Sequence, residues 1–171
     1  MSVQVLIVMG VSGSGKTTLG KALAARLGWA FADADDYHPQ SNREKMARGE
    51  PLTDADREPW LRSLRGLVEQ HLAQASPLVL ACSALKERYR SILSGGLEGV
   101  RYVFLHGDPQ LIAQRMRQRE HFMPVSLLES QLATLEPPQE AIRLDVAQPL
   151  EANLQTVLRH LRFNQEPCDE K

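Results

Sequence analysis

Cysteine is scarce in this sequence of 171 residues, which holds two. Cys82 lies in an apolar run and Cys168 in a polar tail, so their placement favours two free thiols over a disulfide. Long apolar runs are also missing, since no stretch approaches the ~18 residues of a membrane span. No charged leader precedes the first apolar run. We therefore expect a protein of the reducing cytoplasm, without a membrane anchor or an export signal.

An excess of charge of one sign is absent as well. The 20 Lys and Arg residues nearly balance the 21 Asp and Glu residues, and aromatic residues make up 5% of the chain. A general attraction to nucleic acid or to an anionic membrane is thereby excluded, and no aromatic residues are interleaved with basic ones. The five histidines show no metal-ligand spacing, which argues against zinc. We expect a small partner, bound by locally placed cations.

Short apolar runs alternate with segments of helical periodicity along the chain. The runs expected to be strands span residues 3–9, 29–32, 78–82, 100–105 and 141–145. This rhythm predicts one α/β domain over residues 1–171, with a parallel sheet of five strands between helices. An insertion at residues 33–76 is long enough to carry a substrate site. It contains a predicted short helix near residues 42–48 and a longer one capped by Thr53.

A glycine-rich segment follows the first apolar run directly. Main-chain N–H groups of such a loop converge on phosphate oxygens, Lys16 reaches the β- and γ-phosphates, and the Thr17 hydroxyl suits a magnesium ligand. A predicted helix then ends at Gly28, which is typical of a C-cap. The motif predicts a P-loop for a nucleoside triphosphate, the alternative being a glycine-rich turn without a ligand. Its predicted nucleotide-binding residues are Gly10, Val11, Ser12, Gly13, Ser14, Gly15, Lys16, Thr17 and Thr18.

Two carboxylates follow the second predicted strand. The third strand ends in Cys82 and Ser83, so the aspartate that many P-loop enzymes place there is missing. Asp33 and Asp35 would point the same way if the second strand continued through them. Asp33 is then a magnesium ligand, directly or through water, and Asp35 accepts the proton of an incoming hydroxyl. The alternative is an acidic turn.

A histidine and three arginines complete the candidate set. His38 is placed to hydrogen-bond a polyol, although a turn histidine explains it nearly as well. Arg115 and Arg119 lie one turn apart on one helix face, with Arg117 roughly opposite. The pair predicts a phosphate clamp on a lid region at residues 115–124, and a solvated helix face is the alternative.

Further motifs extend from about residue 5 to residue 138. They are Asp33-Ala34-Asp35, His38-Pro39, residues 42–46, Gly49, Pro51-Leu52, Asp54, Asp56-Arg57, Pro59-Trp60-Leu61, residues 82–86, Tyr89-Arg90, Arg115, Arg119, residues 121–124, Leu127-Leu128, Ser130-Gln131 and residues 134–136. With the P-loop, these motifs resemble the gluconokinase family of the bacterial thermoresistant type, within the shikimate-kinase-like group of P-loop kinases. One departure is Ala34, where many relatives have glycine.

The resemblance implies a three-layer fold like that of nucleoside monophosphate kinases, often as a homodimer. It implies transfer of the ATP γ-phosphoryl group to the 6-hydroxyl of D-gluconate with Mg²⁺. The catalytic residues are then Lys16, Asp35 and Arg119, with Thr17 and Asp33 at the metal. The substrate-binding residues are Asp35, His38, Arg57, Lys86 and Arg90. A sugar acid needs a cation for its carboxylate, and Arg57 is the first candidate by analogy, Arg90 the second.

Two other functions stay open from the sequence. One is a kinase for another small acid or a nucleotide, such as shikimate or a nucleoside monophosphate. The other is a P-loop switch that binds nucleotide, phosphorylates nothing and engages a protein partner. The second predicts slow hydrolysis without stimulation by sugar acids.

Overall fold

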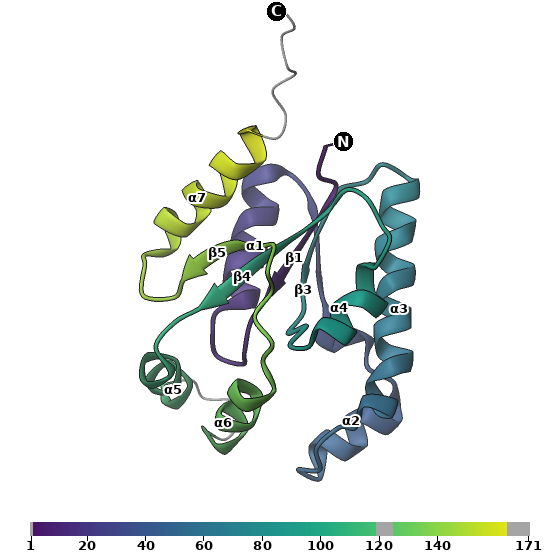
Figure 1. Ribbon diagram of the computed structural model, residues 1–171, viewed down its shortest axis with the longest axis vertical. Coiled ribbons are helices and arrows are strands. Elements are labelled where there is room, and N and C mark those ends of the chain that lie inside the picture. Colours follow the sequence, from purple (N-terminus) through teal and green to yellow (C-terminus); the bar gives the residue numbers. More distant parts are fainter. Residues whose placement is uncertain (1, 119–124, 164–171) are drawn as a thin grey trace, which may run out of the picture.

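A five-stranded parallel sheet forms the centre of the structure, a computed structural model that describes residues 2–118 and 125–163 (Figure 1). The strand order is β2-β3-β1-β4-β5, so the chain winds outward in both directions from β1. The strands are β1 (Val5–Met9), β2 (Ala30–Asp33), β3 (Leu78–Ala81), β4 (Val100–His106) and β5 (Ile142–Asp145). This architecture confirms the predicted α/β class and its parallel sheet.

Helices cover both faces of this sheet. Figure 1 shows α1 and α7 on one face and α3 and α4 on the other, with α2, α5 and α6 gathered beyond the carboxyl ends of the strands. Their bounds are α1 (Lys16–Leu27), α2 (Gln40–Ala47), α3 (Asp54–Ala73), α4 (Glu87–Ser94), α5 (Pro109–Arg117), α6 (Val125–Thr134) and α7 (Leu150–Phe163). The helices on the two faces make three layers.

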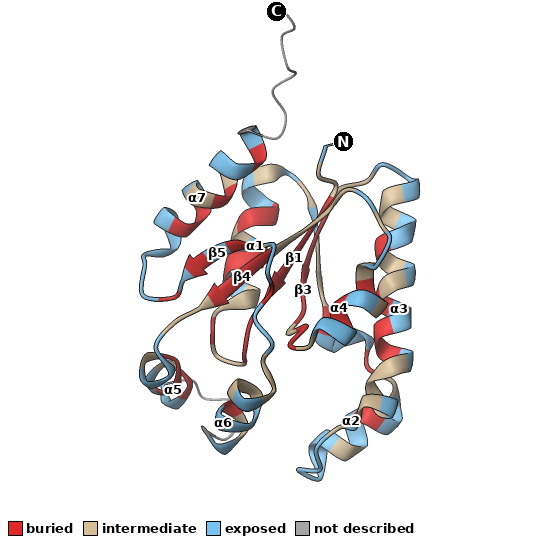
Figure 2. Ribbon diagram, viewed as in Figure 1, coloured by how far each residue is buried: buried red, intermediate tan, exposed pale blue. Residues whose placement is uncertain are grey.

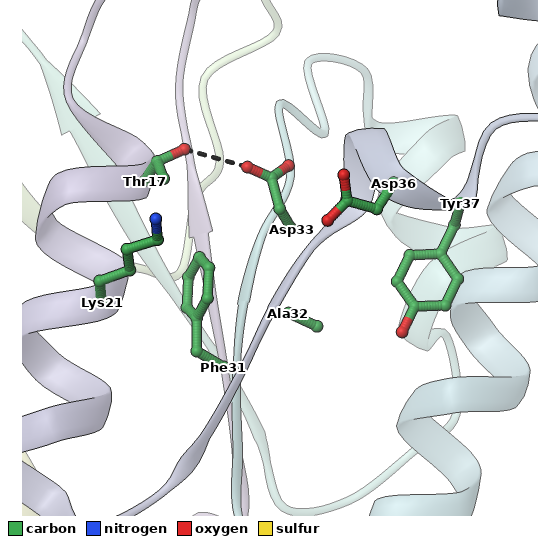
Figure 3. A pocket seen from close by; sticks show the side chains of 7 residues that line it. All are labelled: Thr17, Lys21, Phe31, Ala32, Asp33, Asp36 and Tyr37. Carbon is green, nitrogen blue, oxygen red and sulfur yellow. Dashed lines mark hydrogen bonds between the residues drawn. The ribbon is translucent and has the colours of Figure 1, made fainter.

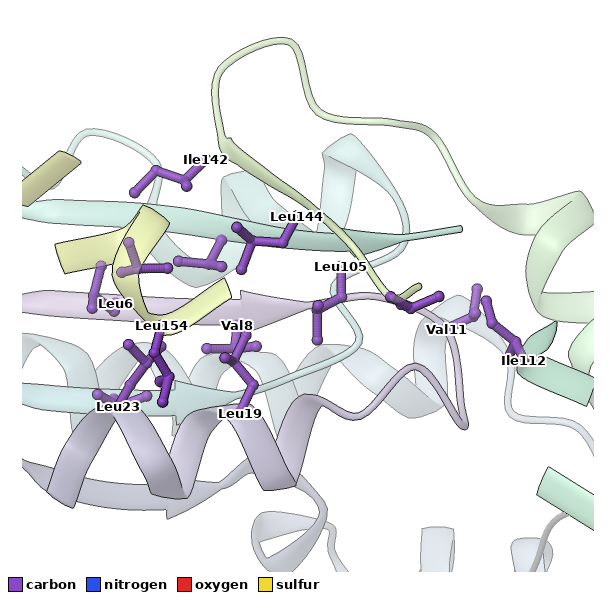
Figure 4. Close-up of a cluster of buried hydrophobic side chains, with 14 of the residues drawn as sticks. Leu6, Val8, Val11, Leu19, Leu23, Leu105, Ile112, Ile142, Leu144 and Leu154 are labelled. Carbon is purple, nitrogen blue, oxygen red and sulfur yellow. The ribbon is translucent and has the colours of Figure 1, made fainter. Parts of the chain in front are cut away.

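The central strand β1 supplies side chains to two separate cores. Val5, Ile7 and Met9 pack against α3 and α4, whereas Leu6 and Val8 pack against α1 and α7. Figure 2 shows the resulting band of buried residues through the sheet, and Figure 4 shows the core that contains Leu6 and Val8. A strand buried on both faces reads as a continuous apolar run, which is why the sequence revealed it so clearly.

Local signals placed the helix ends well. Gly28 ends α1 in the left-handed region with a φ of 70°, and its N–H donates to Ala24. Thr53 and Asp56 form a reciprocal capping box at the start of α3. Asp108 caps α5 by accepting from the N–H of Gln110. The predicted N-cap at Thr53 and the predicted C-cap at Gly28 are therefore confirmed.

Several strand and helix boundaries differ from the expectation by one or two residues. The first strand begins at Val5 rather than at residue 3, and the second is shifted by one residue to 30–33. The short 3-10 helix η1 (Ala34–Tyr37) follows β2 at once, whereas Asp33 and Asp35 would have pointed the same way only if the strand had continued through them. α4 was not predicted, because its inward face includes a buried arginine, Arg90, beside Tyr89 and Leu93.

No helix within residues 2–118 and 125–163 is long and apolar enough to cross a membrane.

Candidate functional site

The glycine-rich loop joins β1 to α1 with two of its glycines in the left-handed region of backbone conformation. Gly13 and Gly15 have φ values of 79° and 95°, which residues with a side chain rarely adopt. A Cβ at Gly13 would lie 2.4 Å from Met116 Cγ, so α5 packs against the loop at this point. The Ser14 hydroxyl is buried and has no hydrogen-bond partner among the described residues. A polar atom left without a partner inside the loop fits a site that an anionic ligand completes.

The two predicted metal ligands lie together. The Thr17 hydroxyl, in the first turn of α1, donates a hydrogen bond to Asp33 Oδ2 at the end of β2 over 3.1 Å. Figure 3 shows both side chains at a cavity of about 690 Å³, which Lys21, Phe31 and Tyr37 also line. A hydroxyl and a carboxylate are hard oxygen donors of the kind that Mg²⁺ prefers. These two side chains therefore fit the metal of a magnesium nucleotide.

Asp35 lies beside Asp33, but for a reason other than the predicted one. The strand does not continue: Asp33 caps η1, and its Oδ1 accepts from the Asp35 N–H at 3.0 Å. Asp35 is open to solvent, yet surrounding protein removes part of its hydration. This lost hydration and the nearby charge of Asp33 raise the pKa of Asp35, against the opposing effect of Lys16. A raised pKa makes a carboxylate a better proton acceptor.

His38 is buried and lies three residues after Asp35 in the chain. Its ring stacks on Trp60 at a centroid distance of 4.1 Å, and its Nδ1 lies 3.3 Å from Asn42 Nδ2. An amide nitrogen only donates, so Nδ1 accepts and the proton of the neutral ring is on Nε2. Burial, with the charges of Arg43 and Arg57, lowers the pKa of His38 to about 4. His38 is therefore a neutral donor near pH 7.

Arg57 and Lys86 share a cluster built on one tyrosine. The Arg57 guanidinium lies over the ring of Tyr89 at 5.4 Å and donates to its hydroxyl at 3.3 Å. Lys86 Nζ lies 5.5 Å from the centre of the same ring. The Tyr89 hydroxyl donates to Asp54 Oδ1 at 2.5 Å, and Lys86 approaches the same oxygen at 3.5 Å. The structure thus brings the two predicted substrate cations together around an anion, Asp54.

Arg90 has a different place. Its side chain is 5% exposed, and its guanidinium donates to the carbonyl oxygens of Ala84 and Glu136 at 2.7 and 2.8 Å. It also forms an ion pair with Glu87 at 3.0 Å. These contacts join α4 to the segment after α6. They make Arg90 a brace between elements, and Arg57 is the better placed of the two for a substrate carboxylate.

Arg115 lies at the other side of the P-loop. It lines a second cavity with Gly13, Ser14, Gly15 and Thr18, and this cavity is also lined by residues 146–150, between β5 and α7. Sequence reasoning missed these residues, although they follow the carboxyl end of a parallel strand, where such folds bind ligands. Arg117 is exposed. Arg119 and the rest of the predicted lid at residues 119–124 lie outside the described residues.

Known proteins match this chain over most of its length. A family model described as shikimate kinase matches residues 12–148. A gluconokinase of Gluconobacter oxydans is 45% identical over 161 residues, which cover 92% of this chain and 90% of that protein.

Two solved structures are also similar. A sugar kinase from Janibacter sp. HTCC2649, in an unliganded structure, has a TM-score of 0.86 and 46% identity and covers 94% of this chain and 95% of that one. A gluconokinase from Sinorhizobium meliloti 1021 has a TM-score of 0.79 and 42% identity, and the match covers 97% of this chain and 100% of that one.

The fold, the P-loop and the family match define the class: the chain belongs to the shikimate kinase family of P-loop kinases. Within that class it belongs with the gluconokinases, as the extent of the match to the Gluconobacter oxydans enzyme shows. The resemblance noted in the sequence is thereby confirmed.

Proposed function

We propose that this chain transfers the γ-phosphoryl group of ATP to the 6-hydroxyl of D-gluconate, giving 6-phosphogluconate and ADP. The match to gluconokinases over more than nine-tenths of the chain carries this proposal. The composition of the site supports it, because it combines a phosphate-binding loop, an acidic pair and a cationic cluster suited to a sugar acid.

The P-loop and its surroundings are proposed to hold ATP. Main-chain N–H groups within residues 10–18 bind the phosphates, apart from the Ser12 N–H, which donates to Gln131, and the nucleoside end enters the cavity beside Arg115. Thr17 and Asp33 would hold Mg²⁺, which supplies positive charge to the phosphates when bound. Lys16 and Arg119 are proposed to stabilise negative charge on the group in transfer.

Asp35 is proposed to accept the proton of the 6-hydroxyl as the new O–P bond forms. The raised pKa suits this role, because the carboxylate binds a proton more strongly than an ordinary aspartate does. His38 is proposed to donate its Nε2–H to a polyol hydroxyl. Both side chains orient the acceptor alcohol, and orientation is the larger part of phosphoryl-transfer catalysis.

Arg57 is proposed to bind the gluconate carboxylate, with Lys86 beside it. The cluster already contains a carboxylate, since Asp54 lies against Tyr89 and Lys86. Two neighbouring cations thus form a site for a second anionic group from the substrate. We further propose that Arg90 contributes through the position of α4 rather than by contact.

The substrate is tested by an ADP-release assay with gluconate, glucose, shikimate and nucleoside monophosphates. Glucose is the informative control, because it offers a 6-hydroxyl without a carboxylate. We expect gluconate-dependent turnover and a kcat/KM for glucose lower by about a hundredfold or more. Equal turnover with glucose, or none with gluconate, would reject the proposal.

We also propose a homodimer, as the family resemblance implies, and a cytoplasmic location, which the placement of the two cysteines favours. Light scattering on the purified protein measures its mass, and a value near 19.1 kDa would contradict a dimer.

A further inference from the structure

Gln131, on α6, contacts the P-loop at Ser12. Its Oε1 accepts a hydrogen bond from the Ser12 N–H at 2.6 Å, and its Nε2 donates to Ser12 Oγ at 3.1 Å. Both polar ends of the amide are therefore used on a single loop residue. The proposed transfer reaction gives this side chain no role of its own.

The Val11–Ser12 peptide group links this contact to the catalytic lysine. The Ser12 N–H faces Gln131, and the Val11 carbonyl oxygen accepts from Lys16 Nζ at 3.0 Å. A planar trans peptide holds its N–H and C=O in opposite directions. Fixing the Ser12 N–H therefore also fixes the oxygen on which the Lys16 ammonium rests.

α6 is itself anchored to the body of the protein. Leu128 packs in the core, and the Glu136 N–H donates to the Leu85 carbonyl at 2.8 Å just beyond the helix. The Glu136 carboxylate also accepts from the Glu87 N–H at 3.1 Å, at the start of α4. Gln131 thus projects from a supported helix, which gives it a defined position relative to the loop.

We propose that Gln131 is a positioning residue for Lys16. By holding the Val11–Ser12 peptide group, it sets the place from which the lysine ammonium reaches the terminal phosphates of ATP. The inference rests on the proposed kinase function. It predicts that loss of the Gln131 amide impairs recognition of the γ-phosphate more than recognition of ADP, because Lys16 reaches the β- and γ-phosphates.

The test compares Gln131→Met with the wild type. Methionine keeps the length and helix propensity of glutamine and removes both hydrogen bonds. The matched control is Gln155→Met on α7, where the glutamine is exposed and donates a hydrogen bond to the side chain of Glu151. If Gln131→Met does not fold, Gln131→Asn is a second variant, because its shorter side chain does not reach Ser12.

Four quantities are measured: kcat, the gluconate KM, and the Kd values of Mg-ATP and Mg-ADP. We expect Gln131→Met to lower kcat about tenfold or more and to raise the ATP Kd about tenfold, with the ADP Kd changed less than about threefold. The gluconate KM stays within about twofold. Gln155→Met matches the wild type.

Equal loss of ATP and ADP affinity with a lower Tm would show a merely structural role and overturn the inference. So would kinetics like those of Gln155→Met. If the wild type showed no gluconate turnover, the proposed function would fail, while the ATP-to-ADP affinity ratio would still decide the role of Gln131.

Discussion

Asp35, the proposed proton acceptor, has an environment that lowers the stability of the fold. Its pKa is raised in the folded protein by lost hydration and by the charge of Asp33. The folded state therefore binds this proton more tightly than the unfolded chain does, so the ionised carboxylate destabilises the fold as pH rises through that range. The environment that would make Asp35 a better general base thus also makes its ionised form destabilising for the folded protein.

Asp35→Asn should lower kcat about a hundredfold or more, since general-base catalysis contributes on that order. The ATP Kd should change less than about twofold. At pH 7 the Tm should rise, and this gain should shrink as pH falls below the folded pKa of the wild-type residue. Steady-state kinetics and thermal melting measure these effects. Unchanged turnover at saturating substrates would remove Asp35 from the reaction.

His38 predicts a separate dependence of stability on pH. Its pKa is about 4 in the folded protein and 6.5 in the reference state, so its contribution is complete above pH 6.5 and is lost as pH falls toward 4. His38→Phe keeps a ring on Trp60 and cannot titrate. Between pH 7 and 4, the Tm of the wild type should fall about 3–6 °C further than that of the variant. Parallel curves would contradict the buried, neutral histidine.

Arg57→Ala should raise the gluconate KM about tenfold to a hundredfold, because a charge-assisted hydrogen bond is lost. The KM for ATP should stay within about twofold. Arg62→Ala is the matched control from the same helix, since Arg62 is exposed and pairs with Glu58 on the surface. A change confined to the ATP KM would mean that Arg57 serves the donor rather than the acceptor.

At the scale of elements, the start of α3 organises the acceptor side. Asp56 closes the capping box and pairs with Lys45 of α2 at 2.9 Å, while Asn42 donates to the Asp56 carbonyl at 2.9 Å. Trp60, one turn further on, donates from Nε1 to the Ala34 carbonyl at 2.7 Å. α3 therefore holds both α2 and η1, and η1 carries Asp35.

Trp60→Phe should loosen this connection. It leaves the Ala34 carbonyl without its indole donor and opens a small cavity, so we expect a loss of stability of about 1–3 kcal/mol. Because η1 carries Asp35, kcat should fall more than the gluconate KM rises. Denaturant unfolding and steady-state kinetics measure the two effects. A purely thermodynamic loss, with kcat unchanged at a temperature where the variant is folded, would show that η1 is positioned by other contacts.

At the scale of the whole molecule, the two halves of the site come from opposite faces of the sheet. α1, α5 and the turn before α7 surround the proposed ATP site, and α3 and α4 supply the proposed gluconate site. The two sides meet beyond the carboxyl ends of the parallel strands, where open α/β sheets bind ligands. The close packing of α5 on the P-loop makes nucleotide binding a property of the assembled domain.

Gly13→Ala tests this packing. The added Cβ would lie 2.4 Å from Met116 Cγ, and the φ of 79° is unfavourable for alanine. We expect about 1–3 kcal/mol of destabilisation and a weakened response to nucleotide. Mg-ATP at a hundredfold excess over its Kd should stabilise the wild type by about 2.7 kcal/mol. Thermal melting with and without Mg-ATP measures this gain, and an undiminished gain in the variant would refute the packing argument.

Much of the fold followed from local patterns. Runs such as residues 5–9 lie on a sheet covered on both faces, so they are apolar without interruption, and caps such as Thr53 and Gly28 satisfy helix ends by contacts within a few residues. The bounds of α4 were not predicted, because Arg90, a charged residue, occupies a buried helix position and donates hydrogen bonds to two carbonyl oxygens. Such partners are distant in sequence and leave no periodic signal.

The sequence by itself determined the parallel α/β order, the P-loop and the acidic pair after β2, because each depends on neighbouring residues. Only the tertiary structure decided that Asp33 caps η1, that Arg90 braces α4 while Arg57 lies on Tyr89, and that Gln131 holds Ser12. The physical reason is that these roles depend on which groups meet across the molecule. Burial, charge and hydrogen-bond geometry at a meeting point are properties of the packed chain.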